Sequence, residues 1–564
     1  TVENAITTTR RAEKNQEINR ILDKVLSIVE EHGDSVISSF GIVLDSAGEY
    51  QFTQTSETQR LRFIADVYGK AKIDQLTKKQ KNQTAADVIH YLCSDERYGY
   101  GLDESSLDAA YILKMINMRY AMNLNSFQQY IDTTLASDVS DETAAAIMEN
   151  KDILTGIDIT EDSVRKYTDA EYFASIIGYT GQISQEEYDA LSEDDKKRYS
   201  LSDTVGKAGL EQTFDSVLQG TKGKTTVYVD NLGRVTDTVS RKEPEAGNDV
   251  YLTIDRDLQI GIYHLIEKQL AGIVADRLVD HDVEITEKTD SSKIQIPVKD
   301  AYYQLINNNV LSLSHMAQDD ASVTEKQIYN TFMVSRQQVL ERIRYELMSD
   351  HPTAMKDLPK DMMAYMVYIY NYLSGSTVGI IQKNKIDQNS AAYLGWKDDT
   401  ISLRDYIYAG ISDNWIDTTR LDVKSKYSSA DDIYSVLVDY VMNQLQDDTK
   451  FAKQIFRYLI NGDVITGKQL CIALYDQGVL PYDAQQVQLL QANGSGYTYT
   501  LIREKIRNIQ LTPAQLALDP CTGGVVITDI KTGQVRALVT YPSYDNNRLS
   551  GSVDAAYFNQ LNED

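Results

Sequence analysis

GGVVITDIKTGQVRALVTY, residues 523–541, is the stretch of the chain that decides the fold class. Two apolar runs flank the polar turn Ile530-Lys-Thr-Gly533, and Gly533 supplies the left-handed residue that such a turn needs. The pattern predicts an antiparallel β-hairpin. The chain therefore contains strands, although most of the sequence before this hairpin has helical patterns.

Upstream of the hairpin, residues 280–515 are dominated by amphipathic helical patterns and contain few glycines. Apolar residues at helical spacing predict helices over Glu325–Leu347, Met362–Leu373, Ile433–Leu445 and Phe451–Ile460. No fixed repeat period is evident, so a solenoid is not expected.

The first half of the chain mixes helices with short strands. Its spacing predicts a helix over residues 12–32 and two hairpins, which pair 40–44 with 50–52 and 225–229 with 234–239. Residues 247–255 are predicted to form a strand that leads into a helix around 258–270. Together these elements predict an α+β fold.

Composition excludes several function classes. The chain has 564 residues and a formal net charge of −27, which argues against nucleic-acid binding and against a polybasic membrane-binding face. No apolar run approaches the ~18 residues of a membrane span, and no signal peptide is visible. The chain begins at Thr1 rather than Met, which favours a trimmed chain whose anchor lies outside it.

Metal and cofactor chemistry has no support in the sequence. Cys93, Cys471 and Cys521 are scattered, and the six histidines never fall at positions i and i+4 of one helix. Acidic runs such as Glu193–Asp195 and Asp398–Asp399 lack the spacing of a calcium loop, so solvated surface is the better interpretation. We therefore expect neither a metal nor a cofactor.

Several separate segments, taken together and in order, resemble the class B penicillin-binding proteins, the monofunctional D,D-transpeptidases that cross-link peptidoglycan. They are Arg165-Lys-Tyr167 followed by FASIIGYTGQIS, Gly206-x-x-Gly209-Leu-Glu211, Asp230-x-x-Gly-Arg234, Leu252-Thr-Ile-Asp255 with Leu258-Gln259, and the hairpin with Tyr541-Pro-Ser-Tyr-Asp-Asn546.

The resemblance implies a domain order. Residues 1–250 would form the pedestal, or dimerisation-type, domain, and 251–279 the first segment of the transpeptidase domain. Residues 280–515 would be a mainly helical insertion, and 516–564 the first, incomplete hairpin of the transpeptidase fold. An orphan hairpin is marginally stable, so we expect residues 516–564 to be poorly ordered or packed awkwardly on the insertion.

Three strings match the catalytic boxes of the family, and each stands in the wrong context. They are Ser163/Lys166 for S-x-x-K, Ser412/Asn414 for S-x-N, and Lys531/Thr532/Gly533 for K-T-G. The first lies in the pedestal element, the second in the insertion and the third at a turn tip. We interpret all three as chance matches, so no catalytic residue is expected in this chain.

Arg165, Gly206, Gly209 and Glu211 are predicted to be structural rather than catalytic. Glu211 would hold neighbouring backbone or Arg165 by charge-assisted hydrogen bonds, with a general-base role as the alternative. The two glycines favour tight-turn geometry over a phosphate loop, because no Lys-Ser/Thr follows them.

The resemblance implies a non-catalytic portion of a penicillin-binding protein, truncated before the S-x-x-K box. The full-length protein would bind stem peptides and β-lactams at the extracellular face of the membrane of a Gram-positive cell, held by an absent N-terminal anchor. A glycosyltransferase or a division or elongation protein would be its partner. The alternative is a complete secreted cell-wall interaction scaffold that has lost the transpeptidase half.

Overall fold

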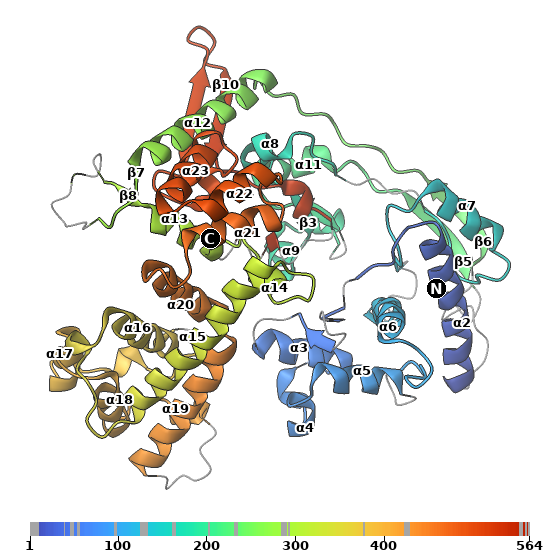
Figure 1. Cartoon of the computed structure of the whole chain (residues 1–564). Coiled ribbons are helices and arrows are strands. Elements are labelled where there is room, and N and C mark those ends of the chain that lie inside the picture. Colours follow the sequence, from blue (N-terminus) through green and yellow to red (C-terminus); the bar gives the residue numbers. More distant parts are fainter. Residues whose placement is uncertain are drawn as a thin grey trace. The chain divides into compact units, whose positions relative to one another are not determined.

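The structure is a computed structural model of the chain, shown in Figure 1. It describes residues 11–38, 40–44, 50–53, 57–70, 72–94, 99–124, 133–160, 165–200, 203–229, 235–283, 290, 294–375, 378–421, 429–551, 557–558 and 561. The chain divides into two compact units, and the fold is α+β, as the sequence predicts. Unit 1 holds residues 1–165 and 216–249, and unit 2 holds 166–215 and 250–564.

Unit 1 is built on the long helix α2, Arg11–Glu31, which confirms the predicted first helix. Its apolar face packs with α5 and α6 around buried residues such as Leu22, Val88 and Ile116. The elements of the unit are α2, β1 (Ile42–Leu44), β2 (Tyr50–Phe52), α3 (Glu57–Val67), η1 (Ile73–Gln75), α4 (Lys78–Lys81), α5 (Ala85–Cys93), α6 (Ala109–Leu124), α7 (Asp141–Glu149), α11 (Asp215–Leu218), β5 (Lys224–Val229) and β6 (Val235–Lys242). Both predicted hairpins, β1–β2 and β5–β6, are antiparallel and are confirmed.

Unit 2 begins with a small α/β segment. It consists of α8 (Ala170–Ile177), β3 (Thr180–Gln182), α9 (Gln185–Ala190), η2 (Asp195–Lys197), β4 (Thr204–Gly206) and α10 (Gly209–Thr213). Strands β3 and β4 pair antiparallel, with Thr180 opposite Gly206. This segment therefore folds with the later part of the chain rather than with unit 1.

A large helical block follows. Its elements are α12 (Arg256–Arg277), β7 (Leu278–Val279), β8 (Ile296–Pro297), α13 (Val298–Asn307), α14 (Leu313–Met316), α15 (Val323–Met348), η4 (Met355–Asp357), α16 (Lys360–Ser374), η5 (Lys383–Lys385), α17 (Ala391–Lys397), α18 (Leu403–Ser412), η6 (Thr418–Arg420), α19 (Ala430–Asp447), α20 (Thr449–Asn461), α21 (Gly467–Asp476), α22 (Ala484–Ala492), α23 (Ser495–Arg507) and α24 (Pro513–Leu516). The four helices predicted in this block are confirmed as α15, α16, α19 and α20. They share one apolar core that runs from Val274 to Leu518.

The hairpin that decides the fold class is formed by β9, Gly523–Thr528, and β10, Val535–Tyr541, and it is followed by η7, Asn546–Arg548. Its inner face packs on α12, where Ala537, Val539 and Tyr541 join Ile262 in a separate small core. Figure 1 shows α12 running alongside this hairpin. The expectation that the hairpin would pack on the insertion was wrong, because α12 supplies its apolar partner.

Helix α12 joins the hairpin to the helical block. Its first half lines the hairpin core, whereas Val274 and Ala275 near its end belong to the core of the block. Arg503 of α23 donates from Nε to the carbonyl of Ala275 at 2.8 Å. One rigid helix is thus packed on both neighbours, although 245 residues separate its end, Arg277, from the start of β9 at Gly523.

Gln259 holds α12 to the edge of β10. Its side chain is fully buried, and its Nε2 donates to the carbonyl of Leu538 at 2.8 Å while Oε1 accepts from the N–H of Leu538 at 2.9 Å. Nε2 also donates to the carbonyl of Tyr172 in α8 at 3.0 Å. The amide therefore bonds to Leu538 as a paired residue of a neighbouring strand would.

The segment before α12 continues along the same strand edge. Thr253 Oγ1 donates to the carbonyl of Val535 at 2.7 Å. The N–H of Asp255 donates to the carbonyl of Arg536 at 2.8 Å. The predicted strand over 247–255 was nevertheless wrong, because these contacts are too few to make a ladder. Asp255 instead caps α12 by accepting from the N–H of Leu258.

Replacing Gln259 tests this link. We expect Gln259→Met to lower the opening free energy of β10 by about 2–4 kcal/mol, because it leaves three buried backbone groups without partners. Amide hydrogen exchange along β10 measures the change. Gln269→Met, at an exposed position of the same helix, is the control and should leave exchange unchanged. Equal exchange in both variants would show that the Gln259 amide does not hold the strand.

Candidate functional site

The predicted structural motif forms a tight backbone crossing between α8 and α10. Gly178 and Gly209 adopt left-handed φ angles of 78° and 59°. A Cβ on Gly209 would lie 2.5 Å from the carbonyl oxygen of Ile176, and one on Gly206 would lie 2.0 Å from that of Glu211. Close backbone packing therefore explains why these positions are glycine, in agreement with the tight-turn interpretation.

Side chains close this crossing from one side. Asp215 accepts from the N–H of Gly206 at 2.8 Å and from the hydroxyl of Tyr199 at 2.6 Å. Burial and the neighbouring Asp215 carboxylate raise the pKa of Tyr199, so its hydroxyl stays protonated and donates. Glu211 is buried in the first turn of α10. Arg165 lies at the end of the first segment of unit 1, and its pairing with Glu211 stays a prediction.

The segment that follows β10 binds this crossing. The fully buried Asn546 donates from Nδ2 to the carbonyl of Gly178 at 2.7 Å, and Tyr544 donates to that of Ala174 at 3.1 Å. Asn547 accepts from the N–H of Tyr167 at 2.8 Å and donates to its carbonyl at 3.0 Å. The sequence placed these residues in two separate motifs of the resemblance, and the fold brings the two motifs together.

The three catalytic-box matches do not form one site among the described residues. Ser163 lies outside them. Ser412 is the last residue of α18, which packs on other helices of the helical block, and Asn414 follows in a left-handed turn with φ 59°. Lys531 lies in the hairpin turn, whereas the hairpin packs on α12. That these strings are chance matches stays a prediction.

The K-T-G string has a local structural role. The carboxylate of Asp529 accepts from the N–H groups of Lys531 and Thr532 at 2.9 and 2.8 Å and from the Thr532 hydroxyl at 3.0 Å. These hydrogen bonds hold the pKa of Asp529 below its usual value. Gly533 closes the turn with φ 72°. The N–H groups of Lys531 and Thr532 and the Thr532 hydroxyl therefore all help to shape the turn.

Among the described residues, no group of three or more His, Cys, Asp or Glu side chains could hold a metal ion. Over the same ranges, no helix combines the length and the apolar character needed to cross a membrane. Cys93 and Cys471 are buried thiols, and burial raises the pKa of each. Neither thiol is therefore a ready nucleophile.

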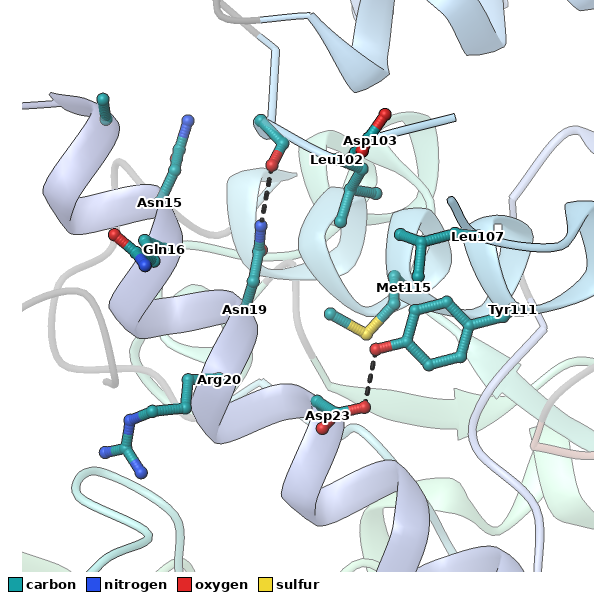
Figure 2. Close-up of a pocket in the computed structure, with 12 residues that line it drawn as sticks. Asn15, Gln16, Asn19, Arg20, Asp23, Leu102, Asp103, Leu107, Tyr111 and Met115 are labelled. Carbon is teal, nitrogen blue, oxygen red and sulfur yellow. Dashed lines mark hydrogen bonds between the residues drawn. The ribbon is translucent and has the colours of Figure 1, made fainter. Parts of the chain in front are cut away.

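Unit 1 has a groove of about 440 Å³ between α2 and α6. Figure 2 shows Asn19 and Asp23 of α2 on one side and Tyr111 and Met115 of α6 on the other. The Tyr111 hydroxyl donates to Asp23 at 2.6 Å, and Asn19 Nδ2 donates to the carbonyl of Tyr100 at 2.9 Å. These polar atoms already hydrogen-bond to other groups of the protein, so the groove is better described as the seam between two packed helices.

A buried arginine lies beneath that seam. Arg119 is 4% exposed, donates to Asn15 Oδ1 at 2.7 Å and to Asn19 Oδ1 at 3.1 Å, and stacks 4.9 Å from the ring centre of Tyr100. The sequence analysis missed this group. Asn15 and Asn19 lie four residues apart on the face of α2 otherwise marked by apolar residues, which was the only signal.

A second groove of about 390 Å³ in the same unit includes an ion pair. His90 Nδ1 lies 2.8 Å from Glu104 Oε2, and this hydrogen bond raises the pKa of His90. The His90 side chain is 80% exposed, so the pair contributes little to stability. It does, however, give this surface a charge that is lost as the pH rises through the raised pKa of His90.

Comparison with known proteins tests the resemblance drawn from the motifs. Residues 2–252 match the family model of the penicillin-binding protein dimerisation domain. Penicillin-binding protein 2A of Bacillus subtilis is 33% identical over 181 residues, covering 31% of this chain and 24% of the relative. Peptidoglycan D,D-transpeptidase MrdA is 29% identical over 154 residues in Acinetobacter baumannii, covering 27% and 22%, and 28% identical over 147 residues in Escherichia coli K12, covering 26% and 23%.

A solved structure, penicillin-binding protein 2B of Streptococcus pneumoniae (strain 5204), aligns with a TM-score of 0.25 and 19% identity over 46% of this chain and 38% of that one. The resemblance to the penicillin-binding proteins that was drawn from the motifs is confirmed. The chain spans about a quarter of the length of these curated relatives. Because MrdA proteins of Gram-negative bacteria match as well, the relatives do not single out a Gram-positive source.

The glycine crossing predicts a position-specific cost. Gly209→Ala should lower the free energy of unfolding of unit 2 by about 3 kcal/mol or more, because the added methyl group meets backbone. The matched control is Gly478→Ala, which has a similar φ of 69° but open space around it, and should cost about 1–2 kcal/mol. Urea unfolding followed by circular dichroism measures both. Equal losses of unfolding free energy in the two variants would mean that the backbone at the crossing can shift to accommodate the methyl group.

His90 predicts a pH dependence of unit 1. Because the folded pKa of His90 is raised, the stabilisation by Glu104 is fully present below the unfolded pKa of about 6.5. It is lost as the pH rises through the folded value. Because the pair is exposed, thermal unfolding of wild type and His90→Gln between about pH 5.5 and 8.5 should differ only slightly in its slope with pH, the variant lacking the His90 contribution. If His90→Gln kept the wild-type slope, the pH dependence of stability would come from other titrating groups.

Proposed function

We propose that this chain is a non-catalytic portion of a class B penicillin-binding protein whose full-length form cross-links peptidoglycan by D-Ala-D-Ala transpeptidation. The match of residues 2–252 to the penicillin-binding protein dimerisation domain carries this proposal. The bonds of Asn546 and Asn547 to the crossing at Gly178 and Tyr167 support it, because they join two motifs of the family in one folded unit.

The full-length protein would take stem peptides as substrates and β-lactams as inhibitors. Its serine would attack the D-Ala-D-Ala carbonyl, release D-Ala, and pass the acyl group to an amine. In this proposal, residues 1–564 lack that serine and act by position. Unit 1 would hold the catalytic domain away from the membrane at the extracellular face and dock a glycosyltransferase or a division or elongation protein.

Absence of acylation is the first test. After incubation of the purified chain with a penicillin, intact-mass spectrometry should find no covalent adduct. Penicillin-binding protein 2A of Bacillus subtilis, treated in parallel, is the positive control. A stoichiometric adduct on Ser163 or Ser412 would contradict the proposal, because it would show that one of the box matches is catalytic.

A second test separates the proposal from the scaffold alternative, which also predicts no adduct. Reading the coding sequence beyond the codon for Asp564 should reveal an S-x-x-K box within a few dozen codons, followed by S-x-N and K-T-G boxes. A stop codon at that point would instead favour the secreted cell-wall scaffold.

A further inference from the structure

Residues 70–81 form a local basic surface on unit 1. The segment reads KAKIDQLTKKQK, and its single acidic residue is Asp74. The net charge of −27 argues against a polybasic face, but an average over 564 residues does not describe this segment. We call its five lysines the lysine patch, and they are Lys70, Lys72, Lys78, Lys79 and Lys81.

The segment that carries the lysine patch is held on the core of unit 1. Leu76 is 5% exposed, and Ile73 packs against the same core. Thr77 and Gln80 form a capping box at α4, in which the N–H of Thr77 donates to Gln80 Oε1 at 2.9 Å and the N–H of Gln80 donates to Thr77 Oγ1 at 3.3 Å. The larger apolar residues of the segment therefore point inward, and the lysines are carried on an ordered surface.

The lysine patch does not serve to hold the fold together. Within the described ranges, none of its five ammonium groups forms an ion pair with a carboxylate, whereas Lys114 and Lys151 of the same unit do. Lys78 and Lys81 lie three residues apart on α4, where like charges lower the stability of a helix. The stability of unit 1 therefore does not explain why so many lysines gather here.

The patch is an open array of charges rather than a pocket. Figure 1 shows α4 at the lower tip of unit 1, beyond α3. Lys72, Lys78 and Lys79 are exposed, and the other two lysines are half-buried. None of the five lines either of the two grooves described in this unit. A small anion would find no enclosed site here, so the partner that fits is an extended anionic surface.

The residue types select the chemistry of that surface. Residues 70–81 contain no arginine and no aromatic residue. Arginine holds single phosphate or carboxylate groups in a fixed bidentate geometry, whereas lysine acts as a flexible point charge. Protein interfaces are enriched in arginine and aromatic residues and depleted of lysine. The patch therefore suits a partner that presents many negative charges without a fixed geometry.

We propose that the lysine patch docks unit 1 on the phosphate headgroups of an anionic lipid membrane. The proposal rests on the proposed function, which places unit 1 at the extracellular face of a membrane. An N-terminal anchor alone leaves a domain free to rotate about its tether. A second, electrostatic contact through the patch would determine which side of unit 1 faces the lipid.

Screening explains how a local patch can act in a chain with a large negative charge. At about 0.1 M salt the Debye length is about 10 Å, so acidic residues farther from the lipid are largely screened while the lysines at the surface are not. Each lysine close to an anionic surface strengthens binding by about fivefold. The contact is weak and reversible, as suits a second attachment beside an anchor.

Two charge-matched variants of the whole chain, residues 1–564, test the proposal. The patch variant combines Lys72→Gln, Lys78→Gln and Lys79→Gln. The control variant combines Lys385→Gln, Lys397→Gln and Lys450→Gln, at three exposed positions of unit 2. Both variants remove three positive charges from solvent-exposed positions, so neither should unfold, and circular dichroism checks this.

Co-sedimentation measures binding to vesicles of phosphatidylcholine with about 30% phosphatidylglycerol, titrated to about 5 mM lipid, and to vesicles of phosphatidylcholine alone. Wild type and the control variant should bind only the anionic vesicles at about 0.1 M salt. Both should release them at about 1 M salt, where the Debye length is about 3 Å. The patch variant should bind about tenfold or more weakly.

Three results would overturn the proposal. They are wild type that binds no anionic vesicles, a patch variant that binds as well as the control, and patch-dependent binding to soluble polyglutamate without binding to vesicles. The last result would point to an acidic protein partner instead. Because vesicle binding needs no acylation, its failure would leave the transpeptidase proposal to be judged by the penicillin test alone.

Discussion

The hydrogen bonds between the side chain of Gln259 and the backbone of Leu538 are the constraint on which unit 2 depends. A hairpin is marginal by itself, and this one is held between a covered edge on β10 and the apolar face of α12. Because α12 also enters the core of the helical block, its position fixes both neighbours. The long segment between α12 and β9 is tolerated because the helical block at one end of it and the hairpin at the other both pack on α12.

The glycine crossing at Gly178, Gly206 and Gly209 is the second fixed point of this unit. It brings backbone so close that no side chain fits, and Asn546 then bonds to the carbonyl of Gly178, while Asn547 bonds to Tyr167 just before α8. Two family motifs that are far apart in the sequence, one after α8 and one after β10, are in this way joined by polar contacts. The bonds around Asp215 and Asn546 end on backbone or on a neutral hydroxyl, which favours a structural role for these motifs.

Local patterns predicted the helices and hairpins well, because apolar spacing and turn residues act over a few positions. Residues 12–32 and 523–541 are examples in which periodicity alone sufficed. The failed prediction at 247–255 shows the limit: its residues look like a strand, yet only Thr253 and Asp255 reach β10. The docking of the hairpin on α12 and the burial of Arg119 depend on contacts between distant residues, which no local pattern reports.

The covered edge of strand β10 explains how a two-stranded sheet is held in this fold. A sheet edge exposes backbone donors and acceptors, and the chain satisfies those of β10 with Thr253, Asp255 and Gln259. Covering this edge stabilises the hairpin and orients its inner face toward Ile262 of helix α12. Because Gln259 also donates to the carbonyl of Tyr172, the same side chain ties α8 to α12, so freeing α12 from β10 should loosen both contacts.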